Sequence, residues 1–247
     1  MKLTVVGCAP AFTSQPGQSS SCYLVEHGRT SILLDLGQGS FSELWQHQSP
    51  ARVAAIVISH MHADHNVDLV PLRHWVRYRN RGYGPALFGP SELRARLGAY
   101  QADPDFLSDL AGESLQPRSM LIGDLRVEAS RVTHIPDSFA FRVTPADGKG
   151  PGLVYSGDCG VADDLLPLVR PSDTFLCEAG FGLTREAPGI HLTAAEAGTV
   201  AKQGAAARLI LTHIHDGTDR AAVLEAATEV FGATSELAEP GMTVDIR

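Results

Sequence analysis

Residues 53–58 form an unbroken run of apolar side chains, and a histidine-rich hexapeptide at positions 60–65 follows almost directly. A strand with one face in water alternates apolar and polar residues, so a continuous run indicates a strand covered on both faces. Such a strand requires further layers of structure on each side of its sheet. This run therefore constrains the architecture more than any other segment.

Other short apolar runs recur along the chain, and helical patterns fit between several of them. A capping-box pattern formed by Thr193 and Glu196 predicts the start of one helix, and a second is expected from about residue 219 to 231. Strands interleaved with helices predict a layered α/β architecture. No linker-like stretch divides the chain, so we predict one domain over residues 1–247. The other predicted strands are 3–6, 22–25, 31–36, 125–132, 139–143, 153–155, 174–177 and 208–211.

The charge balance limits the kinds of partner that the chain can bind. Lys and Arg number 20 against 28 Asp and Glu, a net charge of −8, which argues against binding to a nucleic-acid polymer or an anionic membrane. No window of about 18 apolar residues predicts a membrane span, and residues 1–7 read as a strand rather than a signal peptide. The four cysteines are widely scattered, so no disulfide framework is predicted. We expect a cytoplasmic enzyme.

The hexapeptide His60-Met61-His62-Ala63-Asp64-His65 combines imidazoles with a carboxylate, a donor set that suits zinc and neighbouring divalent ions. Because ligand sites in α/β proteins form beyond the carboxyl ends of strands, further ligands are expected where other apolar runs end. Three positions meet this condition, and together with the hexapeptide they give enough ligands for two ions. The seven candidates are His60, His62, Asp64, His65, His134, Asp158 and His213.

At this point the chain resembles the metallo-β-lactamase-fold hydrolases over nearly its whole length. The resemblance implies a four-layer αββα sandwich with two divalent metal ions at one edge, zinc or alternatively manganese. It also implies how the ligands divide between the ions. His60, His62 and His134 would hold the first ion, Asp64, His65 and His213 the second, and Asp158 would bridge them.

Two such ions activate a shared water as a nucleophile and stabilise the charge that develops in an in-line displacement. Their charge exceeds that of Asp64, Asp158 and a hydroxide, which favours a small anionic substrate. We therefore expect attack by a metal-bridging hydroxide that Asp64 helps to orient. The same centre suits a lactone, a thioester or a β-lactam, so the hexapeptide predicts hydrolysis but leaves the substrate open.

His191 narrows the choice of substrate. It lies two residues before Thr193, where the free N–H groups of a helix N-terminus favour phosphate, and a histidine there can protonate a leaving oxygen. The surrounding segment, 189–198, resembles the histidine motif of the ribonuclease Z and cyclic-nucleotide phosphodiesterase branch, which implies that His191 is the proton donor. Glu178 resembles the glutamate of that branch and would orient His191 or a metal ligand, and Asp35 is a second candidate for such a supporting carboxylate.

Ribonuclease Z itself fits poorly, because its long tRNA-binding arm has no room between His134 and Asp158. The segments Leu-Cys-Glu-Ala at 176–179 and Ser-Gly-Asp-Cys-Gly at 156–160 more closely resemble the actinobacterial cyclic-nucleotide phosphodiesterases of this fold. That resemblance implies hydrolysis of cyclic nucleotides or similar small phosphodiesters, and it is compatible with a homodimer.

Two alternatives remain open from the sequence. One is a lactone, thioester or β-lactam hydrolase of the same fold, and the other is a metal-binding module without turnover. Two further segments have open roles. Residues 73–81 carry four arginines with Trp75 and Tyr78, which would either bind phosphate and a base or form a solvated helix end. Residues 76–118 are the least regular part of the chain and form either a lid or an insertion.

Overall fold

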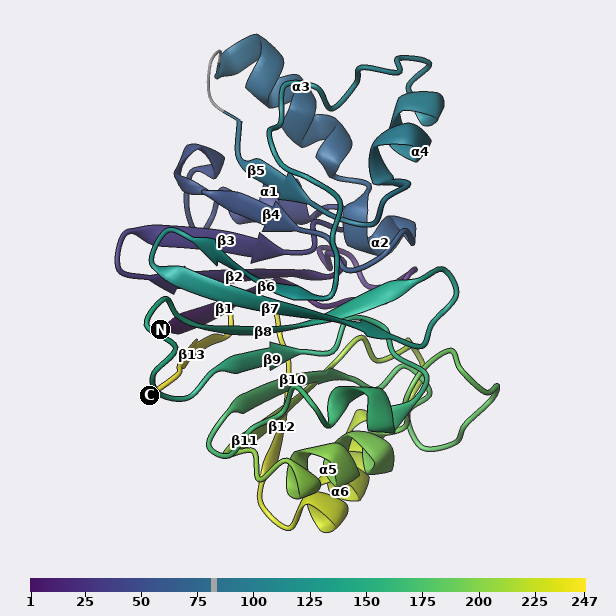
Figure 1. The fold of residues 1–247 in the computed structure, drawn as a ribbon. Coiled ribbons are helices and arrows are strands. Elements are labelled where there is room, and N and C mark those ends of the chain that lie inside the picture. Colours follow the sequence, from purple (N-terminus) through teal and green to yellow (C-terminus); the bar gives the residue numbers. More distant parts are fainter. Residues whose placement is uncertain (81–83) are drawn as a thin grey trace.

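The computed structural model describes residues 1–80 and 84–247. Two mixed β-sheets stack face to face, and helices cover both outer faces (Figure 1). The strands are β1 (Lys2–Gly7), β2 (Cys22–His27), β3 (Thr30–Leu34), β4 (Ala55–Val57), β5 (Ala86–Phe88), β6 (Arg118–Ile122), β7 (Leu125–Val132), β8 (Ser138–Pro145), β9 (Leu153–Tyr155), β10 (Thr174–Glu178), β11 (Arg208–Thr212), β12 (Ser235–Leu237) and β13 (Thr243–Asp245). The α-helices are α1 (Ser40–Leu44), α2 (Ala63–Asn66), α3 (Leu69–Arg79), α4 (Leu93–Tyr100), α5 (Ala194–Gln203) and α6 (Arg220–Phe231), with short 3-10 helices at Pro50–Arg52 and Ala162–Leu165.

The first sheet has the strand order β13-β1-β2-β3-β4-β5, and the second has the order β12-β11-β10-β9-β8-β7-β6. Parallel pairing joins β3 to β4 and β4 to β5 in the first sheet. In the second sheet β9, β10, β11 and β12 are parallel neighbours. The carboxyl ends of these parallel strands lie at one edge of the sandwich, as ligand sites in α/β folds require.

The main core fills the space between the two sheets. Tyr23 of β2 and Tyr155 of β9 meet there with ring centroids 4.8 Å apart. The short strand β4 contributes to two cores, because Ala55 and Val57 face the other sheet while Ile56 packs toward the helices. The strand of the continuous apolar run is therefore covered on both faces, as predicted. The predicted four-layer α/β sandwich is confirmed.

The outer helices form the remaining two layers, α1, α3 and α4 on the first sheet and α5 with α6 on the second (Figure 1). The irregular segment after α3 belongs to the first of these layers, since Leu93, Leu97 and Phe106 are buried with the α3 residue Leu72. These described residues pack as part of the fold rather than as a lid.

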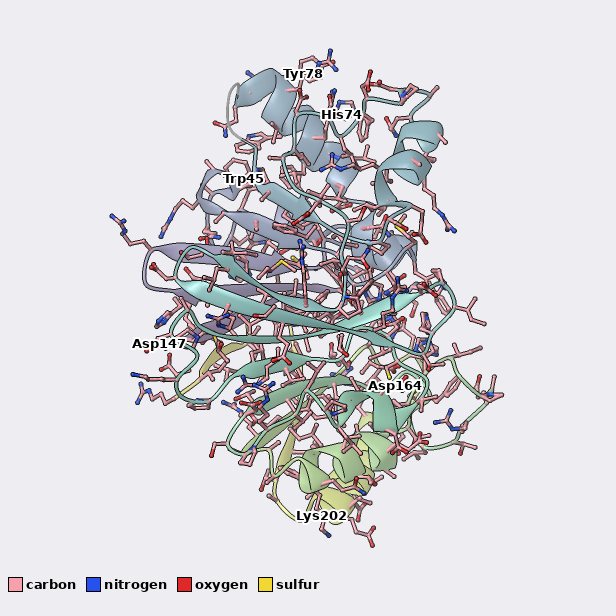
Figure 2. All side chains as sticks on the ribbon, in the orientation of Figure 1. Trp45, His74, Tyr78, Asp147, Asp164 and Lys202 are labelled. Atoms are coloured by element: carbon pink, nitrogen blue, oxygen red, sulfur yellow. The ribbon has the colours of Figure 1, made fainter. Side chains whose placement is uncertain are left out.

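The arginine-rich segment also has a structural role at its first position. The Arg73 guanidinium is buried, donates to the backbone oxygen of Phe106 and forms a 3.3 Å ion pair with Asp109. The interpretation that the arginines of residues 73–81 bind phosphate is therefore wrong for Arg73. Tyr78 lies exposed on the outer helical layer (Figure 2), and Arg81 lies outside the described residues.

The predicted helix boundaries at the second outer layer are confirmed. Thr193 and Glu196 form the reciprocal capping box at the start of α5. Asp219 caps α6 by accepting from two backbone N–H groups. Among residues 1–80 and 84–247, no helix is both long enough and apolar enough to cross a membrane.

Candidate metal centre

The predicted ligands come from separate elements that end at the same edge of the sandwich. His60 follows β4, His134 follows β7, Asp158 follows β9 and His213 follows β11. The hexapeptide continues into α2, whose four residues include Asp64 and His65. The structure brings all seven predicted ligand side chains together.

One group of ligand atoms comprises His60, His62, His134 and Asp158. The Nδ1 atom of His62 lies 3.1 Å from His60 Nε2 and 3.3 Å from His134 Nε2. Asp158 Oδ2 completes the group at 3.5 Å from His60 Nε2. The atoms therefore converge from three strand ends on one small space.

A second group comprises Asp64, His65 and His213. Asp64 Oδ2 lies 3.0 Å from His213 Nε2 and 3.4 Å from His65 Nε2. Asp158 connects the two groups, because its Oδ1 lies 3.3 Å from His65 Nε2 and its Oδ2 lies 3.7 Å from His213 Nε2.

For His65 and His134, the ring nitrogen that faces away from the cluster has a partner that fixes the ring. His65 Nδ1 lies 2.7 Å from Asp35 Oδ2, and His134 Nδ1 lies 2.7 Å from the backbone oxygen of Ile190. Both partners are acceptors, so each Nδ1 carries a proton and each Nε2 is the ring nitrogen available to a metal ion. Neutral imidazoles held in this way are the form that binds a metal ion.

The cluster has lone pairs that the protein itself does not satisfy. Within the described part of the chain, His65 Nε2 and Asp158 Oδ1 are buried and have no hydrogen-bond partner. Burying such atoms without a partner costs about 1–3 kcal/mol each, and a divalent cation would satisfy them. The donor set of imidazole nitrogens and carboxylate oxygens is suited to that cation.

The pKa values of the cluster reflect its burial and its crowding. Burial and the neighbouring His65 hold the pKa of His60 well below its usual value. Burial alone would also lower the pKa of His65, but the carboxylates of Asp158 and Asp35 outweigh it and raise that pKa. Burial opposes ionisation of Asp158, whereas His213, His65 and His60 favour it more strongly and lower its pKa.

His191 lies beside this cluster, as predicted, and is held by Glu178. Its Nδ1 is 3.1 Å from Glu178 Oε1 and 3.9 Å from Asp158 Oδ2. Burial lowers the pKa of His191, but the hydrogen bond and charge of Glu178 raise it to about 9. Glu178 also accepts from the backbone N–H groups of Cys159, Gly180 and Leu192, which fixes its carboxylate.

Asp35 has more partners than the sequence indicated. Besides His65, its carboxylate accepts from the Tyr155 hydroxyl at 2.7 Å and from both the backbone and the hydroxyl of Ser59. Ser59 Oγ in turn lies 3.0 Å from His60 Nδ1. Asp35 therefore orients one histidine of each group, His65 directly and His60 through Ser59.

Sequence reasoning missed one histidine of the site. His215 lies two positions after His213, and its ring nitrogen lies within 4.8 Å of those of His191 and His213. The position of His215 only two residues after the predicted ligand His213 was the available signal.

Residues 30–214 match the family described as the beta-lactamase superfamily domain, and the chain belongs to that family. The match includes all seven candidate ligands. With the geometry above, it identifies the chain as a metallo-hydrolase relative whose His/Asp clusters are suited to divalent metal ions.

Individual relatives agree with this assignment. The chain is 37% identical to the uncharacterized protein Rv1339 of Mycobacterium tuberculosis (strain ATCC 25618 / H37Rv), over 94% of this chain and 87% of the relative. It is 28% identical to the probable metallo-hydrolase YhfI of Bacillus subtilis (strain 168), over 98% of each. The crystal structure of that metallo-β-lactamase-fold protein superposes with a TM-score of 0.84 and 25% identity, over 99% of each chain. A ribonuclease Z of Natronomonas pharaonis is 23% identical, over 100% of this chain and 98% of the relative.

Proposed function

We propose that the protein is a dinuclear-metal phosphodiesterase that hydrolyses cyclic nucleotides or similar small phosphodiesters. The observation that carries the proposal is the position of His191. Glu178 holds its imidazole 3.9 Å from Asp158, at the edge of the ligand cluster. A buried histidine held by a fixed carboxylate is the arrangement that proton donation to a leaving oxygen needs.

We assign the first ion to His60, His62 and His134 and the second to Asp64, His65 and His213, with Asp158 between them. We expect zinc, with manganese as the alternative, because both accept this set of nitrogen and oxygen donors. When bound, the two ions would lower the pKa of a shared water and stabilise negative charge on the reacting group.

The chain's own residues supply the remaining steps. Asp64 Oδ2 lies between His65 and His213, where its carboxylate can accept a hydrogen bond from the attacking water and orient it. His191 uses Nδ1 to bond Glu178, so its Nε2 proton is free to pass to the leaving alkoxide. Glu178 keeps the ring in this orientation and stabilises its positive charge before the transfer.

Substrate charge and relatives support a small phosphodiester. A pair of divalent ions held by two carboxylates, Asp64 and Asp158, would carry more positive charge than its ligands neutralise, which favours an anion over a neutral lactone. One relative is named as a ribonuclease Z, a phosphodiesterase by its name. The net charge of −8 disfavours a polynucleotide, which leaves a small cyclic phosphodiester as the substrate we propose.

The test is a substrate panel with the purified protein, loaded with zinc or manganese, and its His191→Ala variant. We expect the wild type to hydrolyse 2′,3′- or 3′,5′-cyclic nucleotides and bis-p-nitrophenyl phosphate. Loss of a proton donor costs about 10²–10⁴-fold when the leaving group is a poor one. The variant should therefore lose most activity on the cyclic nucleotide and much less on bis-p-nitrophenyl phosphate, whose leaving group needs no proton.

A matched control is His47→Ala, which removes an exposed imidazole from the loop after α1. It should leave both rates unchanged. Hydrolysis of lactones or thioesters with no phosphodiester turnover would assign the protein to the carboxylic-ester hydrolases of the fold. Bound metal without turnover of any of these substrates would identify a metal-binding module instead.

A further inference from the structure

Phe12 is a large aromatic side chain that is 71% exposed and lies near His215. Its ring centroid lies 6.5 Å from that of His215, and His215 lies 5.6 Å from His191 in an edge-to-face arrangement. His191 in turn contacts the ligand cluster through Asp158. Phe12 thus lies next to His215, and His215 lies next to the proposed proton donor His191 and the ligand His213.

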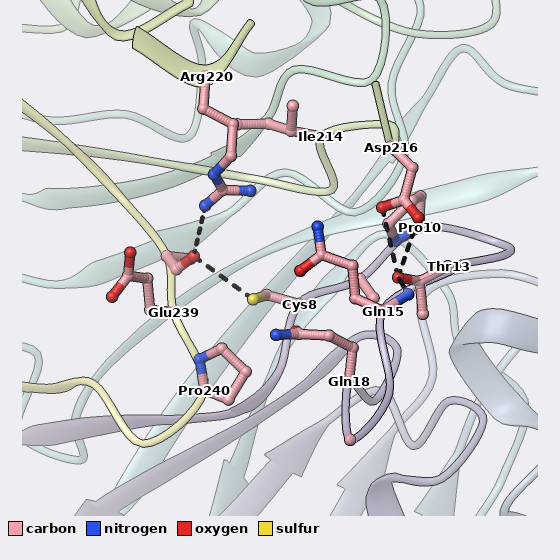
Figure 3. A pocket seen from close by; sticks show the side chains of 13 residues that line it. Cys8, Pro10, Thr13, Gln15, Gln18, Ile214, Asp216, Arg220, Glu239 and Pro240 are labelled. Atoms are coloured by element: carbon pink, nitrogen blue, oxygen red, sulfur yellow. Dashed lines mark hydrogen bonds between the residues drawn. The ribbon is translucent and has the colours of Figure 1, made fainter. Parts of the chain in front are cut away.

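The loop that carries Phe12, residues 8–21 between β1 and β2, is fixed next to His215. Asp216 accepts from the Thr13 hydroxyl at 3.2 Å and from the Ser14 backbone and hydroxyl at 2.5 and 2.9 Å. Figure 3 shows the Thr13 and Asp216 side chains facing each other across this contact. Because Asp216 is the neighbour of His215, the same turn positions both rings.

The loop has a different environment on its other side. A pocket of about 440 Å³ lies there, lined among others by Gln15, Gln18, Arg220 and Glu239 (Figure 3). Phe12 and His215 are not among its lining residues. The phenyl ring is placed instead by its proximity to His215, at 6.5 Å between ring centroids.

His215 has unused hydrogen-bonding capacity. In the described part of the chain its imidazole contacts the rings of Phe12, His191 and His213 but has no hydrogen-bond partner. Phe12 adds an apolar face to this polar ring. A nucleobase has the complementary character, since its faces are apolar and its edge carries donors and acceptors.

We propose that Phe12 and His215 form the subsite that recognises the nucleobase of the substrate, Phe12 by stacking on the base and His215 by hydrogen bonding to its edge. This inference rests on the proposed function, because it requires a phosphodiester that carries a base. In a nucleotide the ribose holds the base beside the phosphate, and His215 and Phe12 likewise lie beside the proposed proton donor His191 and the ligand His213.

The experiment compares two substrates of the metal-loaded protein, adenosine 3′,5′-cyclic phosphate and the 3′,5′-cyclic phosphate of methyl riboside, which has no base. Base–aromatic stacking changes affinity enough that Phe12→Ala should lower kcat/KM for the nucleotide about tenfold to a hundredfold. The rate on the abasic compound should stay unchanged. Phe12→Trp should retain the preference for the nucleotide, because it restores a ring face.

His215→Ala should lower kcat/KM for the nucleotide selectively and leave the metal content unchanged. Tyr100→Ala, which removes an aromatic ring 72% exposed at the end of α4, should change neither rate. An equal loss on both substrates in Phe12→Ala, no loss on either, or the loss of an ion in His215→Ala would overturn the subsite. If the wild type cleaves both compounds equally, the subsite alone is wrong. If it cleaves neither, the proposed function is wrong, and the subsite with it.

Discussion

Replacing Asp35 with asparagine should weaken the binding of one metal ion by changing the tautomer of a histidine. Asp35 accepts from the backbone and the hydroxyl of Ser59, from Tyr155 and from His65. Asparagine suits the site sterically, because it has nearly the same shape and tolerates the left-handed backbone that Asp35 adopts at φ 61°. The substitution therefore changes hydrogen bonding and charge with little change in packing.

The geometry determines how the amide must turn. The Ser59 backbone N–H cannot reorient, so the amide oxygen takes the position of Oδ1 and the NH₂ group takes that of Oδ2. The hydroxyls of Ser59 and Tyr155 can rotate to accept from this NH₂ group. His65 can accept only by moving its proton from Nδ1 to Nε2, and a protonated Nε2 cannot bind a metal ion.

Loss of such a supporting partner typically costs 10–100-fold in metal affinity. We expect a loss of that size for the ion at Asp64, His65 and His213, and a smaller one for the other ion. Losing one hydrogen bond to a charged group should also lower the free energy of unfolding by about 1.5–3 kcal/mol. Competition with a coloured chelator measures the two affinities, and urea denaturation of the metal-free protein measures the stability.

Asp173→Asn is a matched control for this prediction. Asp173 is also fully buried, and its carboxylate accepts from Arg142 and from the backbone N–H of Gly152. The Asp173→Asn variant should lose stability without losing metal affinity. If Asp35→Asn behaves in the same way as Asp173→Asn, the reasoning about the His65 tautomer is wrong and Asp35 only links the strand ends.

Three further changes test other parts of the structure. In Glu178→Gln, an NH₂ group would face N–H donors that now bond to the carboxylate, those of His191 and the backbone. Cyclic-nucleotide turnover should therefore fall about 10–100-fold with unchanged metal content. Loss of an ion in elemental analysis would contradict the assigned role of Glu178. Removing bound metal with a chelator should lower the Tm by about 5–10 °C in a thermal-shift assay, whereas an unchanged Tm would show that no ion stabilises the fold. Gly198→Ala places a Cβ 2.7 Å from the Ala227 backbone oxygen, so the free energy of unfolding should fall by about 1–3 kcal/mol; a gain in urea denaturation would refute this close packing of α5 on α6.

The ligand cluster was predictable because its members occupy one topological position. His134, Asp158 and His213 each follow an apolar run, and parallel strands bring such positions to one edge. The start of α5 was equally readable, since Thr193 and Glu196 bond each other within four residues. Predictions of this kind depend on local contacts or on one rule of topology.

Contacts between distant segments could not be predicted in the same way. Tyr155 bonds Asp35 across 120 positions, and no periodicity relates the two residues. Arg73 resembles the other arginines of its segment in the sequence, but only its position over Phe106 and near Asp109 buries it. Three-residue strands at the sheet edges, such as β12 and β13, are too short to show a pattern.

Backbone strain gives a further link between the sequence and the site. Asp35 and His213 are non-glycine residues with positive φ, at 61° and 57°, a conformation that costs about 1–2 kcal/mol for such residues. Glycine would relieve that cost at either position but would remove the carboxylate that orients His65 or the imidazole beside Asp64. Hydrogen bonds from the two backbone N–H groups, to Val57 and Cys8, help to hold the strained turns. Ala102, Ser172 and Ala205 also adopt positive φ, at 50°, 71° and 52°, and none of them belongs to the candidate site. Positive φ alone therefore does not mark a functional position, and its significance at Asp35 and His213 comes from the side chains that must point into the centre.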